Sequence, residues 1–226
     1  MYFYYMKVKA VITGATGMVG EGVMHECLLS NEVEQVLVIN RKPCGVQHPK
    51  LKEIIHADFS DFSSVENELK EYNAAFLCMG ITSVGAKEDV YTKITYTFTL
   101  ALAATMTKLN PETVICYVSG AGTKQDEGVK NMWIRVKGKT ERDLQKLKCK
   151  AAYMFRPGYI RPIKGMKNTY TIYKILDPFM FPLLKLLAPK TACTLKEIGL
   201  AMITCAGKGY DKNILEVQDI ERAAKL

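Results

Sequence analysis

The sequence predicts an α/β fold: a doubly wound parallel sheet with helices on both faces and a small C-terminal lobe. Short apolar, β-branched runs alternate with helical stretches as far as Gly158. Continuous apolar strands of this kind are typical of a parallel sheet buried on both faces. The chain has 226 residues, 48% of them hydrophobic and 24% charged, as in globular proteins. We expect one domain over residues 1–226, with the lobe within it at approximately 159–212.

Six strands are expected in the first part of the chain, because its apolar runs are short and rich in β-branched residues. The predicted strands are Val8 to Thr13, Val33 to Asn40, Glu53 to Asp58, Ala74 to Gly80, Thr113 to Gly120 and Ala151 to Gly158. Longer stretches between them predict helices. These are Val19 to Ser30, Phe62 to Tyr72, Asp89 to Leu109 and Trp133 to Cys149.

Beyond Gly158 the alternation loosens. Prolines recur up to Pro189 and predict loops and short helices, because proline interrupts helical hydrogen bonding. A late helix, Leu195 to Ala206, and a late strand, Ile214 to Val217, are expected after them.

The charge of the chain is basic, at +8 with neutral histidines. Many of the basic residues fall between Lys130 and Lys150, on a predicted helix. A basic helix can meet nucleic acid or an anionic membrane, but more often it is a solvated face. Since no helix-turn-helix, RNA-binding sheet or zinc-finger pattern accompanies it, we expect no nucleic-acid partner.

Seven cysteines are present, several of them inside apolar runs and none in a CxxC pair. They indicate free thiols in a reducing compartment, and the three histidines have no metal-ligand spacing, so we expect no metal. The opening MYFYYM is too short for a signal peptide, and Met6 is an alternative start. The stretch from Tyr173 to Pro189 falls short of a membrane span. We expect a cytoplasmic protein and leave its oligomeric state open.

A glycine loop, GATGMVG, joins the first strand to the first helix. Glycines at this junction let the chain turn sharply and let backbone amides approach a pyrophosphate at the helix N-terminus. The alternative is a tight turn without a ligand. The candidate pyrophosphate-binding residues are Gly14, Thr16, Gly17, Met18, Val19 and Gly20.

The second strand ends in Asn40, Arg41 and Lys42, where a carboxylate would favour NAD. Arg41 and Lys42 would instead pair with a 2′-phosphate, which predicts NADP, with NAD less favoured; the alternative is two solvated side chains. Further cofactor contacts are expected where the third and fourth strands end. They are Asp58 and Phe59 beside the adenine, and Cys78, Met79 and Gly80 beside the middle of the cofactor.

Four segments together resemble the short-chain dehydrogenase/reductase superfamily: GATGMVG, YVSGAG, WIRVKGKTE and FRPG. The similarity is greatest to its atypical members, namely the Tat-interacting oxidoreductase group and the NAD-dependent epimerase/dehydratase-like proteins. It covers roughly residues 7 to 160. The resemblance implies a Rossmann-type sheet that binds NAD(P), and a Ser, a Tyr and a Lys that act on a carbonyl or an alcohol.

Carried over by position, the family serine falls on Ser119, which would orient the substrate oxygen. The family lysine falls on Lys137, which would hold the nicotinamide ribose. The family tyrosine, however, falls on Trp133, and an indole cannot act as a general acid or base. A displaced phenol from Tyr91, Tyr96 or Tyr159 is the alternative.

The segment Arg156, Pro157 and Gly158 would pass beside the nicotinamide, as the resemblance implies. The expected function is an NADP-binding, oxidoreductase or epimerase-like enzyme for a small carbonyl or alcohol. The alternative is a non-catalytic module on the same fold that senses NADPH or binds a protein partner. The sequence names no substrate.

Overall fold

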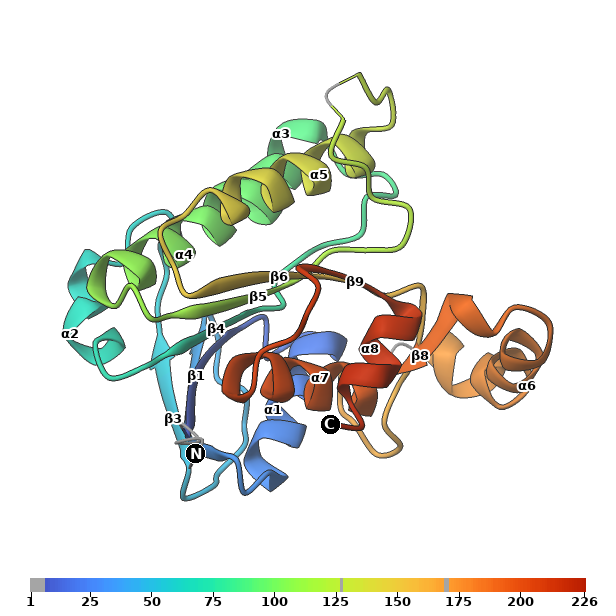
Figure 1. The fold of residues 1–226 in the computed structure, drawn as a ribbon, viewed down its shortest axis with the longest axis horizontal. Coiled ribbons are helices and arrows are strands. Elements are labelled where there is room, and N and C mark those ends of the chain that lie inside the picture. The colour runs from blue at the N-terminus through green and yellow to red at the C-terminus, as the bar shows by residue number, and fades with distance from the viewer. Residues whose placement is uncertain (1–6, 127, 169–170) are drawn as a thin grey trace.

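Seven parallel strands form the central sheet, in the order β3-β2-β1-β4-β5-β6-β9 (Figure 1). The computed structural model describes residues 7–126, 128–168 and 171–226, except for the side chains of 171–176. The expected start at Met6 lies outside the described residues. The strands are β1 (Val8–Thr13), β2 (Val33–Asn40), β3 (Leu51–Ile55), β4 (Ala74–Leu77), β5 (Val114–Val118), β6 (Ala151–Arg156) and β9 (Ile214–Glu216). The predicted fold class is confirmed.

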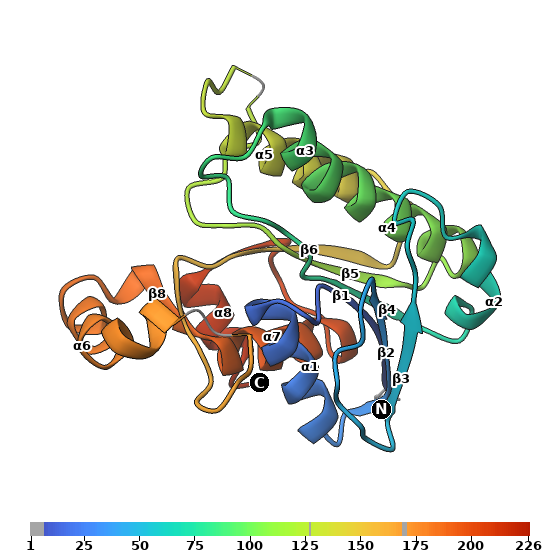
Figure 2. The same cartoon turned by 180° about the vertical axis from the view of Figure 1, so that it is seen from behind.

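Two helical layers cover the sheet, one on each face (Figures 1 and 2). Side chains alternate across a strand, so Ala10 and Ile12 of β1 join the core on one face and Val11 joins the core on the other. The first layer consists of α1 (Met18–Leu29), α7 (Leu195–Gly207) and α8 (Val217–Ala223). The second consists of α2 (Glu66–Leu69), α3 (Glu88–Thr92), α4 (Phe98–Leu109) and α5 (Met132–Gln145).

The long helix predicted from Asp89 to Leu109 is present as a continuous run through α3 and α4. Between these helices, Lys93–Thr97 has π-helical hydrogen bonding. Such segments insert one residue into a turn, and they are frequent near functional sites. Thr95 of this segment is buried against α5, where its carbonyl accepts a hydrogen bond from Thr140.

The segment after β6 departs most from the prediction of loops and short helices. A second small sheet pairs β7 (Tyr159–Arg161) with β8 (Ala192–Thr194), and α6 (Thr171–Leu187) lies at one end of the molecule (Figure 2). Pro178 and Pro182 are inside α6 and are exposed. Water can therefore solvate the carbonyls that these prolines leave without an amide donor, and the helix continues.

Other boundaries also differ. β3 starts at Leu51 and ends at Ile55, not at Asp58, because its partner β2 ends at Asn40, which pairs with Ile55. The short helix α8 was not expected. None of the helices that the structure describes is long and apolar enough to cross a membrane.

Candidate functional site

The candidate site lies along the carboxyl ends of the parallel strands. The strand order reverses direction between β1 and β4, since the chain proceeds from β1 through β2 to β3 on one side and from β4 through β5 to β6 on the other. Ligands of open α/β sheets bind in the crevice outside such a switch point. The glycine loop, Arg41, Cys78 and Ser119 follow the strands that end there.

The three glycines of the loop have different surroundings. Gly14 has a φ of +77°, and a Cβ on it would lie 2.8 Å from backbone atoms of Cys78 and Met79. A Cβ on Gly20 would lie 2.2 Å from the Gly14 oxygen. On Gly17 a Cβ would meet only that oxygen, at 3.4 Å. Gly14 and Gly20 therefore shape the turn, whereas Gly17 leaves an open face at the N-cap of α1.

A basic hollow of about 610 Å³ lies beside this loop. Its lining comprises Thr16, Arg41, Lys42, Pro43, Cys44, Lys167 and Asn168. Arg41 and Lys42 are exposed, and neither forms an ion pair with a carboxylate of the described residues. The open face of Gly17 and these free cations suit the pyrophosphate and a further phosphate of a dinucleotide.

Two residues near the hollow escape prediction from the sequence. The carboxylate of Glu53, on β3, accepts hydrogen bonds from Asn40 Nδ2 and from the Cys44 amide, both at 2.8 Å. Glu53 thereby fixes the chain on both sides of Arg41 and Lys42. Lys167 lies on a loop more than 120 residues after Arg41 in the sequence. No local sequence signal identifies either residue, because their proximity depends on strand register and chain topology.

The residues expected near the adenine separate into one exposed and one buried side chain. Asp58 is exposed and accepts hydrogen bonds from the hydroxyl and the amide of Ser60, which lower the pKa of its carboxyl. Phe59 is 2% exposed and packs edge-on against Phe62, with ring centroids 5.6 Å apart. Phe59 is thus a core residue in this structure, and Asp58 is open to the solvent.

The residues after β4 approach the glycine loop through their backbone. Cys78 and Met79 are half-buried and lie against Gly14, whereas Gly80 is exposed and has open space where a Cβ would be. Burial raises the pKa of the Cys78 thiol far above its usual range. The Cys78 side chain is therefore an uncharged wall of the crevice.

Lys137 lies against the end of β5, where it contacts the backbone of Ser119. Lys137 Nζ donates hydrogen bonds to the carbonyl oxygens of Val118 and Ser119, at 3.2 and 3.1 Å. Burial lowers the pKa of Lys137 to about 8. Ser119 Oγ lies 3.1 Å from Thr123 Oγ1, which itself donates to the Gly120 carbonyl. The Ser119 proton therefore points to Thr123 and must turn to reach a substrate.

Trp133 lies in the first turn of α5, where Asn131 caps the helix by accepting the Trp133 amide hydrogen bond. Cβ atoms built on Gly120 and Gly122 would lie 3.8 and 4.0 Å from its indole ring. The ring therefore packs over the turn that follows Ser119. The helix that bears Lys137 thus also presents the Trp133 indole to this turn.

The tyrosines considered as substitutes are engaged elsewhere. Tyr96 donates a hydrogen bond to Asp143, at 2.9 Å, and Tyr159 donates one to Asp177, at 3.1 Å. Tyr91 is 2% exposed, and burial raises its pKa. The ring of Tyr117 lies 5.4 Å from Lys137 Nζ, but its hydroxyl is fully buried and burial raises its pKa too. None of these four phenols is placed as an accessible proton donor.

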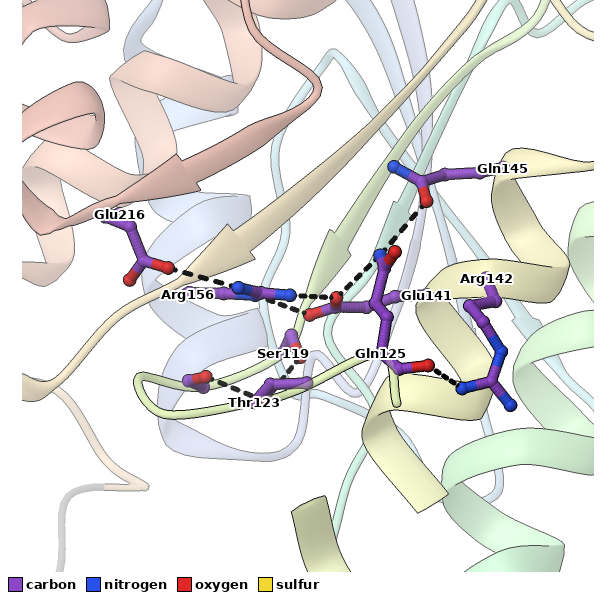
Figure 3. A network of polar contacts seen from close by, with 9 residues as sticks. Ser119, Thr123, Gln125, Glu141, Arg142, Gln145, Arg156 and Glu216 are labelled. Atoms are coloured by element: carbon purple, nitrogen blue, oxygen red, sulfur yellow. Dashed lines mark hydrogen bonds and ion pairs between the residues drawn. The ribbon is translucent and has the colours of Figure 1, made fainter. Parts of the chain in front are cut away.

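The Arg156–Gly158 segment adjoins the Ser119 loop through its backbone. The Pro157 carbonyl accepts the Ala121 amide hydrogen bond at 2.8 Å, and a Cβ on Gly158 would lie 2.1 Å from the Thr191 oxygen. The guanidinium of Arg156, however, is bound by the carboxylates of Glu141 and Glu216 (Figure 3). Its backbone, rather than its charge, borders the crevice.

The described residues contain no group of three or more side chains that could hold a metal ion, and all seven cysteines are free thiols. The parallel sheet, its switch point and the glycine loop define a Rossmann-type protein of the short-chain dehydrogenase/reductase class. The profile of the NAD dependent epimerase/dehydratase family matches residues 10–131, more than half of the chain. The chain belongs to this family.

Relatives and solved structures agree with this assignment. The Scheffersomyces stipitis protein FMP52-1, mitochondrial, is 26% identical over 73% of this chain and 74% of its own length. The Candida glabrata protein FMP52, mitochondrial, is 29% identical over 67% of this chain and 63% of its own length. By these names the relatives are mitochondrial proteins, which contradicts the expected cytoplasmic location. That expectation rested on composition and the absence of a visible signal, and neither identifies a compartment.

Two solved structures illustrate the shared fold. The Bordetella bronchiseptica enzyme WbmF, in complex with NAD+ and UDP, has a TM-score of 0.67 at 14% identity, over 94% of this chain and 73% of its own. L-sorbose reductase from Gluconobacter frateurii, complexed with NADPH and L-sorbose, has a TM-score of 0.66 at 13% identity, over 93% of this chain and 94% of its own. At these identities the likeness establishes the fold.

Proposed function

We propose that this protein binds NADP(H) across the carboxyl ends of its strands. The observation that carries the proposal is the open face of Gly17 beside the unpaired Arg41 and Lys42. A dinucleotide places its pyrophosphate at such a helix N-terminus and its adenosine ribose beside the end of β2. The 2′-phosphate distinguishes NADP(H) from NAD(H), and the two cations would neutralise it.

The remaining contacts follow from the order of the strands. Backbone amides of Thr16, Met18 and Val19 would hold the pyrophosphate against the open face of Gly17, whose own amide donates to the Gly14 carbonyl at 2.9 Å. Asp58 and the backbone of the buried Phe59 would flank the adenine, and Cys78, Met79 and Gly80 would face the middle of the dinucleotide. Lys137 would hold the nicotinamide ribose, and the backbone of Arg156, Pro157 and Gly158 would border the nicotinamide.

Calorimetric titration with NADPH and with NADH tests the proposal. We expect NADPH to bind at least about tenfold more tightly, because each charge-assisted hydrogen bond to the phosphate stabilises the complex. Replacing both cations, in the Arg41→Ala/Lys42→Ala variant, removes this preference and leaves NADH binding nearly unchanged. Equal affinities in the wild type contradict the choice of NADP(H), and no binding of either contradicts the function itself.

The site supports dinucleotide binding better than carbonyl reduction of the Ser-Tyr-Lys kind. The Trp133 indole N–H is too weak an acid to transfer its proton near neutral pH, and the tyrosines nearest the crevice are buried or hydrogen-bonded to acids. A module that senses NADPH, or that meets a protein partner when NADPH is bound, needs no such proton.

Slow reduction of a small carbonyl compound is the second candidate, and the low pKa of Lys137 favours it. With a pKa of about 8, the buried ammonium can release a proton near neutral pH. Lys137 Nζ would protonate the carbonyl oxygen that Ser119 would orient, and NADPH, when bound, would supply the hydride. Turnover with small ketones that falls above pH 8 and is lost in Lys137→Met supports this candidate; no turnover supports the binding module.

We also propose a mitochondrial location, from the names of the relatives. Fractionation of cells that express the full chain with a C-terminal tag tests it. Recovery in the cytosolic fraction alone would contradict this location.

A further inference from the structure

The loop that follows β7 is fastened to the first turn of α1. The amides of Lys167 and Asn168 donate hydrogen bonds to the two carboxylate oxygens of Glu21, at 2.9 and 2.8 Å. On the same loop, Met166 is 8% exposed and packs into the core beside α1 and α7. One buried side chain and one carboxylate therefore fix the position of Lys167, although its side chain is exposed.

This position puts Lys167 in the basic hollow with Arg41 and Lys42. Its Nζ reaches toward the β2–β3 connection and lies 3.5 Å from the Gly45 carbonyl oxygen, at the outer limit of a hydrogen bond. A weak contact to one neutral oxygen leaves the ammonium free to turn to an anion at little cost.

Among the described residues, the acids around the hollow form no ion pair with its three cations. Glu21 directs both oxygens to backbone amides, and Glu53 accepts from Asn40 and Cys44. Among the described residues, Lys167 also has no ion-pair partner. Three cations against these two carboxylates leave the hollow with a positive excess, which favours a phosphate group.

We propose that Lys167 is a third ligand of the cofactor 2′-phosphate, and that Glu21 is a positioning residue that delivers it. The inference rests on the proposed NADP(H) binding and deepens it. Arg41 and Lys42 approach the phosphate from the end of β2, and Lys167 approaches it from the segment that leads to α6. Binding of NADPH, but not of NADH, then ties this C-terminal segment to the sheet.

The test uses the full chain and compares NADPH with NADH by calorimetry. We expect Lys167→Met to weaken NADPH binding about tenfold, as the loss of one charge-assisted contact implies, and NADH binding less than about twofold. Lys164→Met is the matched control, because Lys164 is exposed on the same loop but does not line the hollow. It should leave both affinities within about twofold of the wild type.

Glu21→Ala frees the two amides and should reduce the preference for NADPH over NADH nearly as much as Lys167→Met. In the double variant the two effects should not add, since both act through the same side chain. If Glu21 only supported the fold, its replacement would lower Tm and leave the ratio of the two affinities unchanged, which would overturn its assigned role.

Dinucleotide binding by the wild type separates the role of Lys167 from the proposed function. If the wild type binds neither dinucleotide, the proposed function is wrong and the inference falls with it. If the wild type prefers NADPH but Lys167→Met weakens both dinucleotides equally, or neither, Lys167 is not a phosphate ligand while the function stands.

Discussion

Arg156 makes two hydrogen bonds to the fully buried carboxylate of Glu141, from Nε at 3.0 Å and from Nη2 at 2.6 Å (Figure 3). Gln125 donates a third hydrogen bond to that carboxylate, at 3.1 Å. The ion pair of Arg156 and Glu141 joins the end of β6 to α5, one turn beyond Lys137. It therefore ties the helix that carries Lys137 and Trp133 to the sheet.

Removing the charge of Glu141 should destabilise the protein strongly. Glu141→Gln leaves Arg156 largely buried beside a neutral amide, and losing one partner of a buried pair costs about 3–5 kcal/mol. Urea unfolding at neutral pH measures this loss. The control is Glu216→Gln, because Glu216 binds Arg156 from an exposed position, and it should cost about 1 kcal/mol or less. Equal losses in the two variants would show that Glu141 has no special role in holding α5.

The sequence predicts those elements that local pattern determines. The bounds of β1 and β2 match the prediction, because their apolar runs are buried on both faces and end at polar residues. Ser119 and Lys137 were named as candidate site residues only from the family resemblance, and the contact between Lys137 and the Ser119 backbone comes from the structure. α6 was missed, because proline is read locally as a helix breaker and its exposure is set by the tertiary structure. Glu53 and Lys167 were missed because register and topology alone bring them to Arg41.

Substitutions of Gly17 and Gly14 should show which glycine serves ligand binding and which serves the fold. Gly17→Val leaves room for its Cβ in the turn but fills the open face, so it should abolish NADPH binding with little change in Tm. Gly14→Val places a side chain against the backbone of Cys78 and Met79, just after β4, at a positive φ, so it should destabilise the fold. Thermal unfolding and calorimetry on both variants test this. Undiminished NADPH binding by folded Gly17→Val would place the dinucleotide elsewhere.

Lys137 should make stability depend on pH in one direction. Its pKa is lowered to about 8 in the folded protein, so between about pH 8 and 10 the unfolded chain binds more protons than the folded protein. The free energy of unfolding contributed by Lys137 therefore rises over this range. The wild type should gain about 1–2 kcal/mol relative to Lys137→Met between pH 7 and 10, an amount discounted because the largely buried side chain keeps some exposure. The cysteines and tyrosines titrate in both proteins, so their contributions cancel in the difference between the two free energies of unfolding. A constant difference would mean that the ammonium is solvated.

Trp133 offers the sharpest distinction between an enzyme and a binding module. Its indole packs over the turn after Ser119, one helical turn before Lys137, and a tyrosine ring is smaller than the indole it would replace. Trp133→Tyr therefore restores a phenol beside an ammonium, which lowers the pKa of a phenol. If the missing acid alone limits catalysis, NADPH oxidation with small ketones and quinones should rise about 10²-fold or more.

Trp133→Phe is the matched control, because it supplies a ring without a hydroxyl and should leave the rate at the wild-type level. A fast wild type that stays fast in Trp133→Phe would mean that another group donates the proton. An inactive protein that Trp133→Tyr leaves inactive, while it still binds NADPH, would establish that the rest of the site has also lost the geometry for hydride transfer.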